Sequence, residues 1–199
     1  MYDWPAVDHE QLHRARAERI GALMRAERLD HLLLTSFDNI RYVTGYRTQI
    51  ISEGFGWFAA VARRDGDFEI FVPWVEETSR EPDPSLPGLA AVHPLPSWTP
   101  AVPHAPYWTQ ALHRSLAGSR ARRVGYEMVY AELLGPLAEA LPQIEFVPVT
   151  TALHELRMRK DELELRLLEA ASNVNSMAAT TALKAAGPGS GIGHRFRRR

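Results

Sequence analysis

The segment His31–Tyr46 constrains the fold more than any other part of the sequence. It opens with an apolar run, Leu32–Leu34, which is typical of a short strand buried on both faces. The polar residues after this run are of the kinds that cap the start of a helix: Thr35, Ser36, Asp38 and Asn39. A single helical turn can follow from Ile40, and Gly45 can end it because glycine readily takes a positive φ. The segment therefore predicts a strand, a capped turn and a glycine stop.

Strand-like and helix-like stretches alternate along most of the chain. An apolar stripe with arginines on the opposite, solvated face predicts a helix at His9–Glu27. An Asp-Gly pair between Trp57–Ala62 and Phe68–Val72 is typical of a hairpin that joins two strands. The other predicted elements are a short helix at Trp74–Arg80, a strand at Ala90–His93, a helix at Ala105–Leu116, a strand at Arg123–Glu127, a helix at Ala131–Leu141 and a strand at Ile144–Val149. Residues 82–106 carry eight of the fourteen prolines, so we expect an irregular crossing there. This order of elements predicts an α/β layer fold with a mixed sheet.

A long helix is predicted after this layer. Asp161 followed by Glu164 has the pattern of a capping box, and apolar residues recur at helical spacing from Glu162 to about Lys184. Such a helix is roughly 34 Å long at 1.5 Å per residue. Its wide apolar stripe needs a partner, although the α/β layer is complete by Val149.

Three landmarks, in order along the chain, resemble a known amino-terminal domain. The run Thr35–Tyr46, TSFDNIRYVTGY, resembles the S-x-x-N-I-x-Y-x-T-G-Y signature of the creatinase, prolidase and aminopeptidase P family of metallohydrolases. A helix and a strand precede it, as in the family. Further on, Leu156–Glu164 resembles the R-x-x-K-s-x-x-E junction between that domain and the catalytic one. The resemblance covers roughly residues 9 to 188 and implies a ribonuclease H-like sheet of about six strands with flanking helices, followed by one long helix.

This resemblance implies a division of the chain into three parts. Residues 1–155 are the amino-terminal domain, and 156–188 are the junction and first helix of an incomplete "pita-bread" catalytic domain. Residues 189–199 form a basic tail in which four of the last five residues are arginine. We interpret this ending as a truncated or frame-shifted reading frame, with a genuine basic tail as the alternative. The GPGSGIG run does not follow a strand and open a helix, so it does not fit a dinucleotide-binding loop.

The resemblance also implies where the chemistry lies. In the family, two aspartates, a histidine and two glutamates of the catalytic domain hold one or two divalent metals such as manganese, cobalt, zinc or iron. After Asp161 this chain has no aspartate, its only histidine is His194, and its glutamates lie on the long helix. We therefore expect no catalytic residue, metal ligand or cofactor in this chain, and no activity of the chain by itself.

Two other groups of residues could form a site. His9-Glu10-Gln11-Leu12-His13 matches H-E-x-x-H, but it lies on a charged helix without an apparent third ligand, so we interpret it as a chance match. By resemblance, the loop after the Thr-Gly-Tyr turn reaches the active-site rim of a second subunit, where Arg47 would pair with a substrate carboxylate and Phe55 and Trp57 would wall the pocket. The alternative is that Phe55 and Trp57 pack into the core and Arg47 is solvated.

The predicted function is the amino-terminal, substrate-rim and oligomerisation part of a Xaa-Pro aminopeptidase or dipeptidase-like metallohydrolase. The alternatives are a fragment of a creatinase-like amidinohydrolase and a stand-alone domain that associates with itself. The partner is then a second copy or the missing catalytic domain. The formal net charge of −1 gives no general attraction to nucleic acid, and no apolar run is long enough to predict a membrane span. We expect a cytoplasmic protein.

Overall fold

The computed structural model describes residues 8–47, 58–73, 86–96, 105–129 and 131–186. The chain divides into two compact units. The larger unit comprises residues 13–159, and the smaller one combines residues 1–12 with 160–199.

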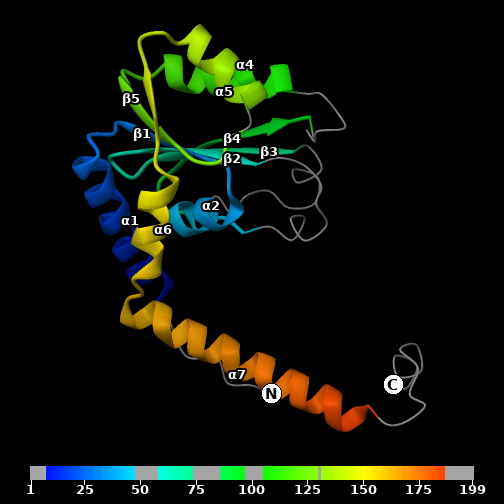
Figure 1. The fold of residues 1–199 in the computed structure, drawn as a ribbon. Helices are drawn as coiled ribbons and strands as arrows, with labels where there is room; N and C mark the ends of the chain where they lie inside the picture. Colours follow the sequence, from blue (N-terminus) through cyan, green and yellow to red (C-terminus); the bar gives the residue numbers. More distant parts are fainter. Residues whose placement is uncertain (1–7, 48–57, 74–85, 97–104, 130, 187–199) are drawn as a thin grey trace. The chain divides into compact units, whose positions relative to one another are not determined.

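The larger unit is built on a mixed sheet of six strands in the order β4-β3-β2-β1-β5-β6 (Figure 1). The strands are β1 (His31–Leu34), β2 (Ala59–Arg63), β3 (Phe68–Pro73), β4 (Leu89–Leu95), β5 (Arg123–Tyr126) and β6 (Glu145–Pro148). β1 pairs antiparallel with β2 and parallel with β5, and β5 pairs parallel with β6. The predicted α/β fold with a mixed sheet of about six strands is confirmed.

Helices cover both faces of this sheet (Figure 1). One face carries α2 (Phe37–Thr44), α6 (Thr150–Met158) and residues 13–26 of α1 (His9–Ala26). The opposite face carries α4 (Ala105–Ala117) and α5 (Ala131–Ala140). Each face has its own apolar core, because successive strand residues point to opposite sides.

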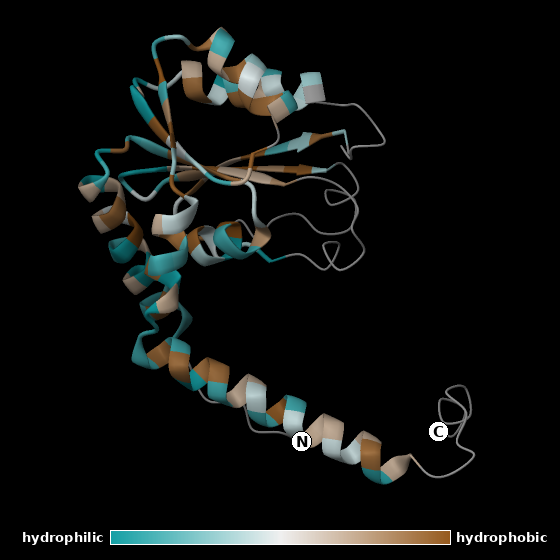
Figure 2. Cartoon of the chain, in the orientation of Figure 1, coloured by the Kyte–Doolittle hydropathy of each residue, from teal (hydrophilic) through white to brown (hydrophobic). Residues whose placement is uncertain are grey.

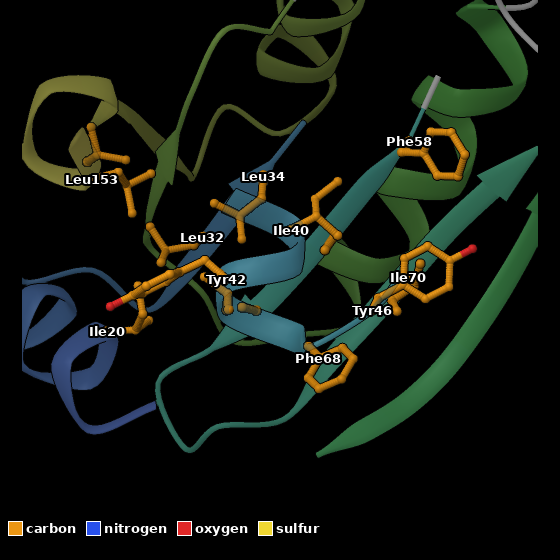
Figure 3. Packing of buried hydrophobic residues seen from close by; sticks show 14 of the residues in the cluster. Ile20, Leu32, Leu34, Ile40, Tyr42, Tyr46, Phe58, Phe68, Ile70 and Leu153 are labelled. Atoms are coloured by element: carbon orange, nitrogen blue, oxygen red, sulfur yellow. The ribbon is translucent and has the colours of Figure 1, made fainter. Parts of the chain in front are cut away.

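The core beneath α1, α2 and α6 joins all three helices to the central strands (Figure 3). Ile20 of α1, Ile40 of α2 and Leu153 of α6 meet Leu32 and Leu34 of β1 there. The α4 and α5 core centres on Trp108, which is completely buried and donates its indole N–H to the Pro96 carbonyl oxygen, 2.8 Å away. β1 contributes residues to both cores and is therefore held firmly between them. The residues at its two ends are fixed in position as a result.

Two features of this unit differ from the prediction. α2 begins at Phe37 rather than near Ile40, because the Ser36 side chain caps the helix by accepting from the Asn39 N–H. α6 was not among the predicted helices. β-Branched Val149, Thr150 and Thr151 favour a strand locally, but burial of Leu153 against the sheet outweighs that preference. The predicted helix at Trp74–Arg80 lies outside the described residues.

The smaller unit contains α7 (Glu162–Ala185), within one residue of the predicted helix. The predicted capping box is present: Asp161 Oδ1 accepts from the Glu164 N–H at 2.8 Å, and Glu164 Oε2 accepts from the Asp161 N–H at 3.3 Å. Apolar and polar residues alternate along the helix (Figure 2). Large apolar side chains remain exposed along it, with fractions of 55% for Leu165, 51% for Leu168, 57% for Met177 and 75% for Leu183. No helix within the described ranges has the length and apolarity needed to cross a membrane.

Candidate functional site

The signature segment forms a buried polar network at the carboxyl ends of β1 and β5. Because these strands are parallel neighbours, the residues that follow them meet at one edge of the sheet. Glu127 directly follows β5 and is 1% exposed. Its carboxylate lies against Ser36 and Asn39, which come from the loop after β1 and the first turn of α2.

Four donors surround the Glu127 carboxylate. The Thr35 and Ser36 N–H groups donate to Oε1 at 3.2 and 3.0 Å, and the Ser36 hydroxyl lies 3.0 Å from both carboxylate oxygens. The Asn39 Nδ2 donates to Oε2. The Thr35 hydroxyl also donates to the Glu127 main-chain oxygen at 2.9 Å. A buried carboxylate with this many donors is well satisfied, so the arrangement fixes the start of α2 against β5.

A second layer ties α6 to the same network. Arg157 Nη1 donates to Asn39 Oδ1 at 2.9 Å, and Arg157 Nη2 lies 3.6 Å from Asp38 Oδ2. The Tyr42 ring faces three guanidinium groups, with its centroid 4.6 Å from Cζ of Arg16 and 6.0 Å from those of Arg19 and Arg157. The structure thus joins Asn39 and Tyr42 of the signature to Arg157 of the junction motif, which are far apart in the sequence.

This network corrects one prediction and adds one residue. The arginines of α1 were predicted on its solvated face, but Arg16 and Arg19 are only partly exposed. Arg16 covers the Tyr42 ring, and Arg19 Nη2 donates to the Arg159 main-chain oxygen at 2.6 Å. Glu127 was not singled out from the sequence. The signal that identifies it is a carboxylate at the end of the predicted strand Arg123–Glu127, which ends at Tyr126 in the structure, on the edge where the polar signature residues also emerge.

The turn that ends α2 positions the predicted rim loop. Gly45 has φ 73° and donates its N–H to the Arg41 carbonyl oxygen, as a left-handed cap requires. The Thr44 hydroxyl donates to the Ile40 carbonyl oxygen at 2.7 Å and accepts from the Tyr46 N–H at 3.1 Å. Tyr46 is buried with its ring centroid 6.5 Å from that of Phe58. Arg47, the next residue, is exposed. Phe55 and Trp57 lie outside the described residues, so their predicted role stays a prediction.

The residues of the chain that the structure describes do not fit a metal centre. They contain no group of three or more His, Asp or Glu side chains that could hold an ion. His9 and His13 of the H-E-x-x-H match both lie on α1. Burial lowers the pKa of the His13 imidazole, with an opposing contribution from the main chain of Pro87 and a further lowering by the charge of Arg16.

One acid–histidine pair lies on the α4 side of the sheet. Glu69 is buried and contacts Arg63 through Oε1, and its Oε2 lies 2.8 Å from His93 Nε2. The His93 ring stacks on Phe71 with centroids 4.5 Å apart. These contacts tie together β2, β3 and β4. Among the described residues, the pair contacts Arg63 and Phe71 and no serine or threonine, so we assign it to sheet stability.

Comparison with solved structures shows which proteins share this fold. A Xaa-Pro dipeptidase from Bacillus anthracis matches with a TM-score of 0.61 and 17% identity, over 87% of this chain and 44% of the dipeptidase. A prolidase from Pyrococcus horikoshii matches with a TM-score of 0.58 and 16% identity, over 87% of this chain and 43% of the prolidase. A proline dipeptidase structure from Streptococcus pneumoniae matches with a TM-score of 0.52 and 20% identity, over 72% of this chain and 98% of that structure. This chain thus spans under half the length of the first two proteins.

Comparison at the level of sequence gives the family. No protein of curated function matches the chain. The model of the creatinase/prolidase amino-terminal domain matches residues 16–159, which contain the sheet, both cores and the Glu127 network. The chain belongs to the creatinase/prolidase amino-terminal domain family.

Proposed function

We propose that this chain is the amino-terminal part of a Xaa-Pro aminopeptidase or dipeptidase-like metallohydrolase, and that it is not catalytic by itself. The observation that carries the proposal is the family match over residues 16–159, followed at once by a helix with exposed leucines and methionine. In this proposal α7 is the first helix of the catalytic domain, and its apolar residues pack against the sheets of that domain. A fragment of a creatinase-like amidinohydrolase is the alternative within the same family.

The proposed division of the chain follows the sequence, with one adjustment. The parts are 1–155, 156–188 and the basic tail 189–199. Because α6 continues across the 155/156 boundary to Met158, we extend the amino-terminal domain to the end of that helix. One compact unit ends at Arg159 and the other resumes at Lys160, which supports a boundary just after α6.

The parent reaction would be hydrolysis of the peptide bond before proline. A divalent metal such as manganese, cobalt, zinc or iron, held by the catalytic domain, would supply an activated water. The described residues do not fit such a site, so we assign no step of that reaction to them. The similarity to a Xaa-Pro dipeptidase and a prolidase supports this substrate class. We propose a cytoplasmic location, which fits a chain without cysteine.

The proposed contribution of this domain to the parent enzyme is a rim residue supplied to a second subunit. Arg47 is exposed and directly follows the buried Tyr46, so its main chain starts from a fixed point. A guanidinium group there can pair with the terminal carboxylate of a dipeptide substrate. Phe55 and Trp57 would provide the apolar wall of that pocket.

Two measurements test the proposal. The nucleotide sequence after the codon for Gly189 should encode, in one of its frames, roughly 200 further residues with aspartate, aspartate, histidine, glutamate and glutamate in that order. The purified 199-residue chain should hold no stoichiometric metal and should not hydrolyse a Xaa-Pro dipeptide in the presence of Mn²⁺. Closed frames, or turnover by the purified chain, would overturn the proposal.

The exposed apolar side chains of α7 favour a second candidate function, a stand-alone domain that associates with itself. Light scattering after size exclusion would then give a dimer whose fraction rises with protein concentration. Replacing Leu165, Leu168 and Met177 by serine should return the protein to a monomer. A wild-type chain that stays monomeric across the concentration range would rule out this candidate.

A further inference from the structure

A basic cavity lies at the edge of the sheet opposite the Glu127 network. It has a volume of about 510 Å³ and is widely open to solvent. It forms where the amino end of β1 meets the end of its antiparallel neighbour β2, and the loop from α4 to β5 closes one side. His31, the first residue of β1, is paired in register with Arg63, the last residue of β2.

Arginine side chains from three parts of the unit converge on this cavity. Arg25 comes from the last turn of α1, Arg63 and Arg64 from the end of β2, and Arg120 from the loop before β5. Two carboxylates also line it, Asp30 and Asp65, and Glu69 pairs with Arg63. Four guanidinium groups therefore still outnumber three carboxylates with His31 neutral.

Asp30, one of the two carboxylates that line the cavity, already has hydrogen-bond partners on both of its oxygens. Asp30 Oδ2 accepts from the main-chain N–H groups of Arg122 and Arg123 at 2.9 and 3.1 Å, and Asp30 Oδ1 accepts from Arg64 Nη2 at 2.9 Å. Asp30 thus holds Arg64 in place against the start of β1. Within the described residues, Arg25 and Arg120 are exposed and have no ion pair that would occupy their guanidinium groups.

A buried imidazole in the wall of the cavity has unused polar atoms. His31 is 8% exposed, and within the described residues neither Nδ1 nor Nε2 makes a hydrogen bond of normal geometry, although the main chain of Asp30 is close enough to oppose the lowering of its pKa. The neighbouring Arg63 Nε is also buried without a partner. Buried polar groups are normally satisfied, so these atoms beside the basic cavity have spare hydrogen-bonding capacity that a ligand could use.

We propose that this cavity binds the phosphate group of a small phosphorylated molecule. A tetrahedral oxyanion offers acceptor oxygens in several directions, which suits guanidinium groups that approach from α1, β2 and the α4–β5 loop. His31 adds a donor from the wall of the cavity. The open side of the cavity leaves room for the rest of a phosphorylated molecule. This inference is independent of the proposed peptidase relationship.

Calorimetric titration of the 199-residue chain with pyrophosphate tests this site, with succinate as the carboxylate comparison at the same ionic strength. We expect saturable binding of pyrophosphate and at least tenfold weaker binding of succinate. Arg120→Gln and Arg25→Gln should each lower the affinity for pyrophosphate about tenfold, as expected for loss of one charged hydrogen bond. Arg41→Gln, an equal charge change at an exposed residue outside the cavity, should leave the affinity within twofold.

A further variant separates a binding role of His31 from a packing role. His31→Phe keeps an aromatic ring of similar size and removes both nitrogens, so it should preserve the melting temperature while weakening pyrophosphate binding at least fivefold. Absence of saturable binding to the wild-type chain, equal affinity for succinate, or an equal loss in Arg41→Gln would overturn the proposal. Undiminished binding in a folded His31→Phe variant would contradict the role of the imidazole.

Discussion

Glu127 shows how a carboxylate in an apolar layer can be a structural rather than a catalytic group. It is 1% exposed, yet donors from Thr35, Ser36 and Asn39 satisfy both of its oxygens. Ser36 and Asn39 are signature positions in the family resemblance. Their position in the structure indicates that they hold α2 against β5. A structural role therefore explains why the signature contains a serine and an asparagine at these positions.

Replacement of this carboxylate should destabilise the fold. Glu127→Gln puts an amide NH₂ where an acceptor stood, so at least one buried donor loses its partner. We expect the free energy of unfolding to fall by about 2 kcal/mol. Urea denaturation measures the effect, and Glu132→Gln at an exposed position on α5 is the matched control. Equal denaturation midpoints for the two variants would contradict this account.

The buried His31 makes stability depend on pH. Burial lowers the pKa of its imidazole below the usual 6.5, the charge of Arg63 adds to this, and the main chain and charge of Asp30 together with Asp65 oppose it. Between the lowered pKa and 6.5 the unfolded chain binds more protons than the folded one, so stability decreases as the pH falls through this window.

His31→Phe should therefore flatten the dependence of the urea midpoint on pH between about 7.5 and 5. His154→Phe, at an exposed position on α6, is the control and should keep the wild-type slope. Because burial also lowers the pKa of His13, some slope should remain in the His31 variant. A slope as steep as that of the wild type would show that His31 does not titrate in this way.

At the scale of elements, the end of α2 depends on the backbone of one glycine. Gly45 takes φ 73°, and the nearest atoms to an added Cβ are 3.6 Å or more away, so the cost of a side chain there comes from the backbone and not from crowding. Gly45→Ala should lower stability by about 1 kcal/mol. Gly135→Ala, in α5 with no atom within 4 Å of the added Cβ, should raise it by about 0.5–1 kcal/mol. Thermal melts of the two variants that shift in the same direction would contradict the prediction.

The elements that were predictable from the sequence are those whose local signals agree with the packing. β1, the β2–β3 hairpin and α7 have an apolar run, an Asp-Gly turn and a capping box respectively, and the structure has all three. α6 was missed because its first residues favour a strand and Val149, its N-cap residue, makes no side-chain cap hydrogen bond. Glu127 and the cavity around His31 depend on which strands are neighbours, and that pairing is not encoded in any local pattern.

At the scale of the whole molecule, the two units should be separable. The sheet and both cores lie within residues 13–159, so a chain that ends at Arg159 keeps every residue of those cores. We expect this shortened chain to melt cooperatively within a few degrees of the full chain. It should also bind less of the dye ANS, since Leu165, Leu168 and Met177 are removed. Loss of the cooperative melt, or unchanged ANS fluorescence, would show that α7 belongs to the folding unit.

The Glu127 network also sets an order of events during synthesis on the ribosome. Ser36 lies 91 residues before its acceptor Glu127, and Asn39 lies 118 residues before Arg157. At 5–20 residues per second, the ribosome needs roughly 6 to 24 s to make the second of these spans. Until that interval ends, α2 lacks at least one of its two polar partners, Glu127 and Arg157. A chaperone that shields this early segment would therefore act before Arg157 leaves the exit tunnel, and would have no further task once it has.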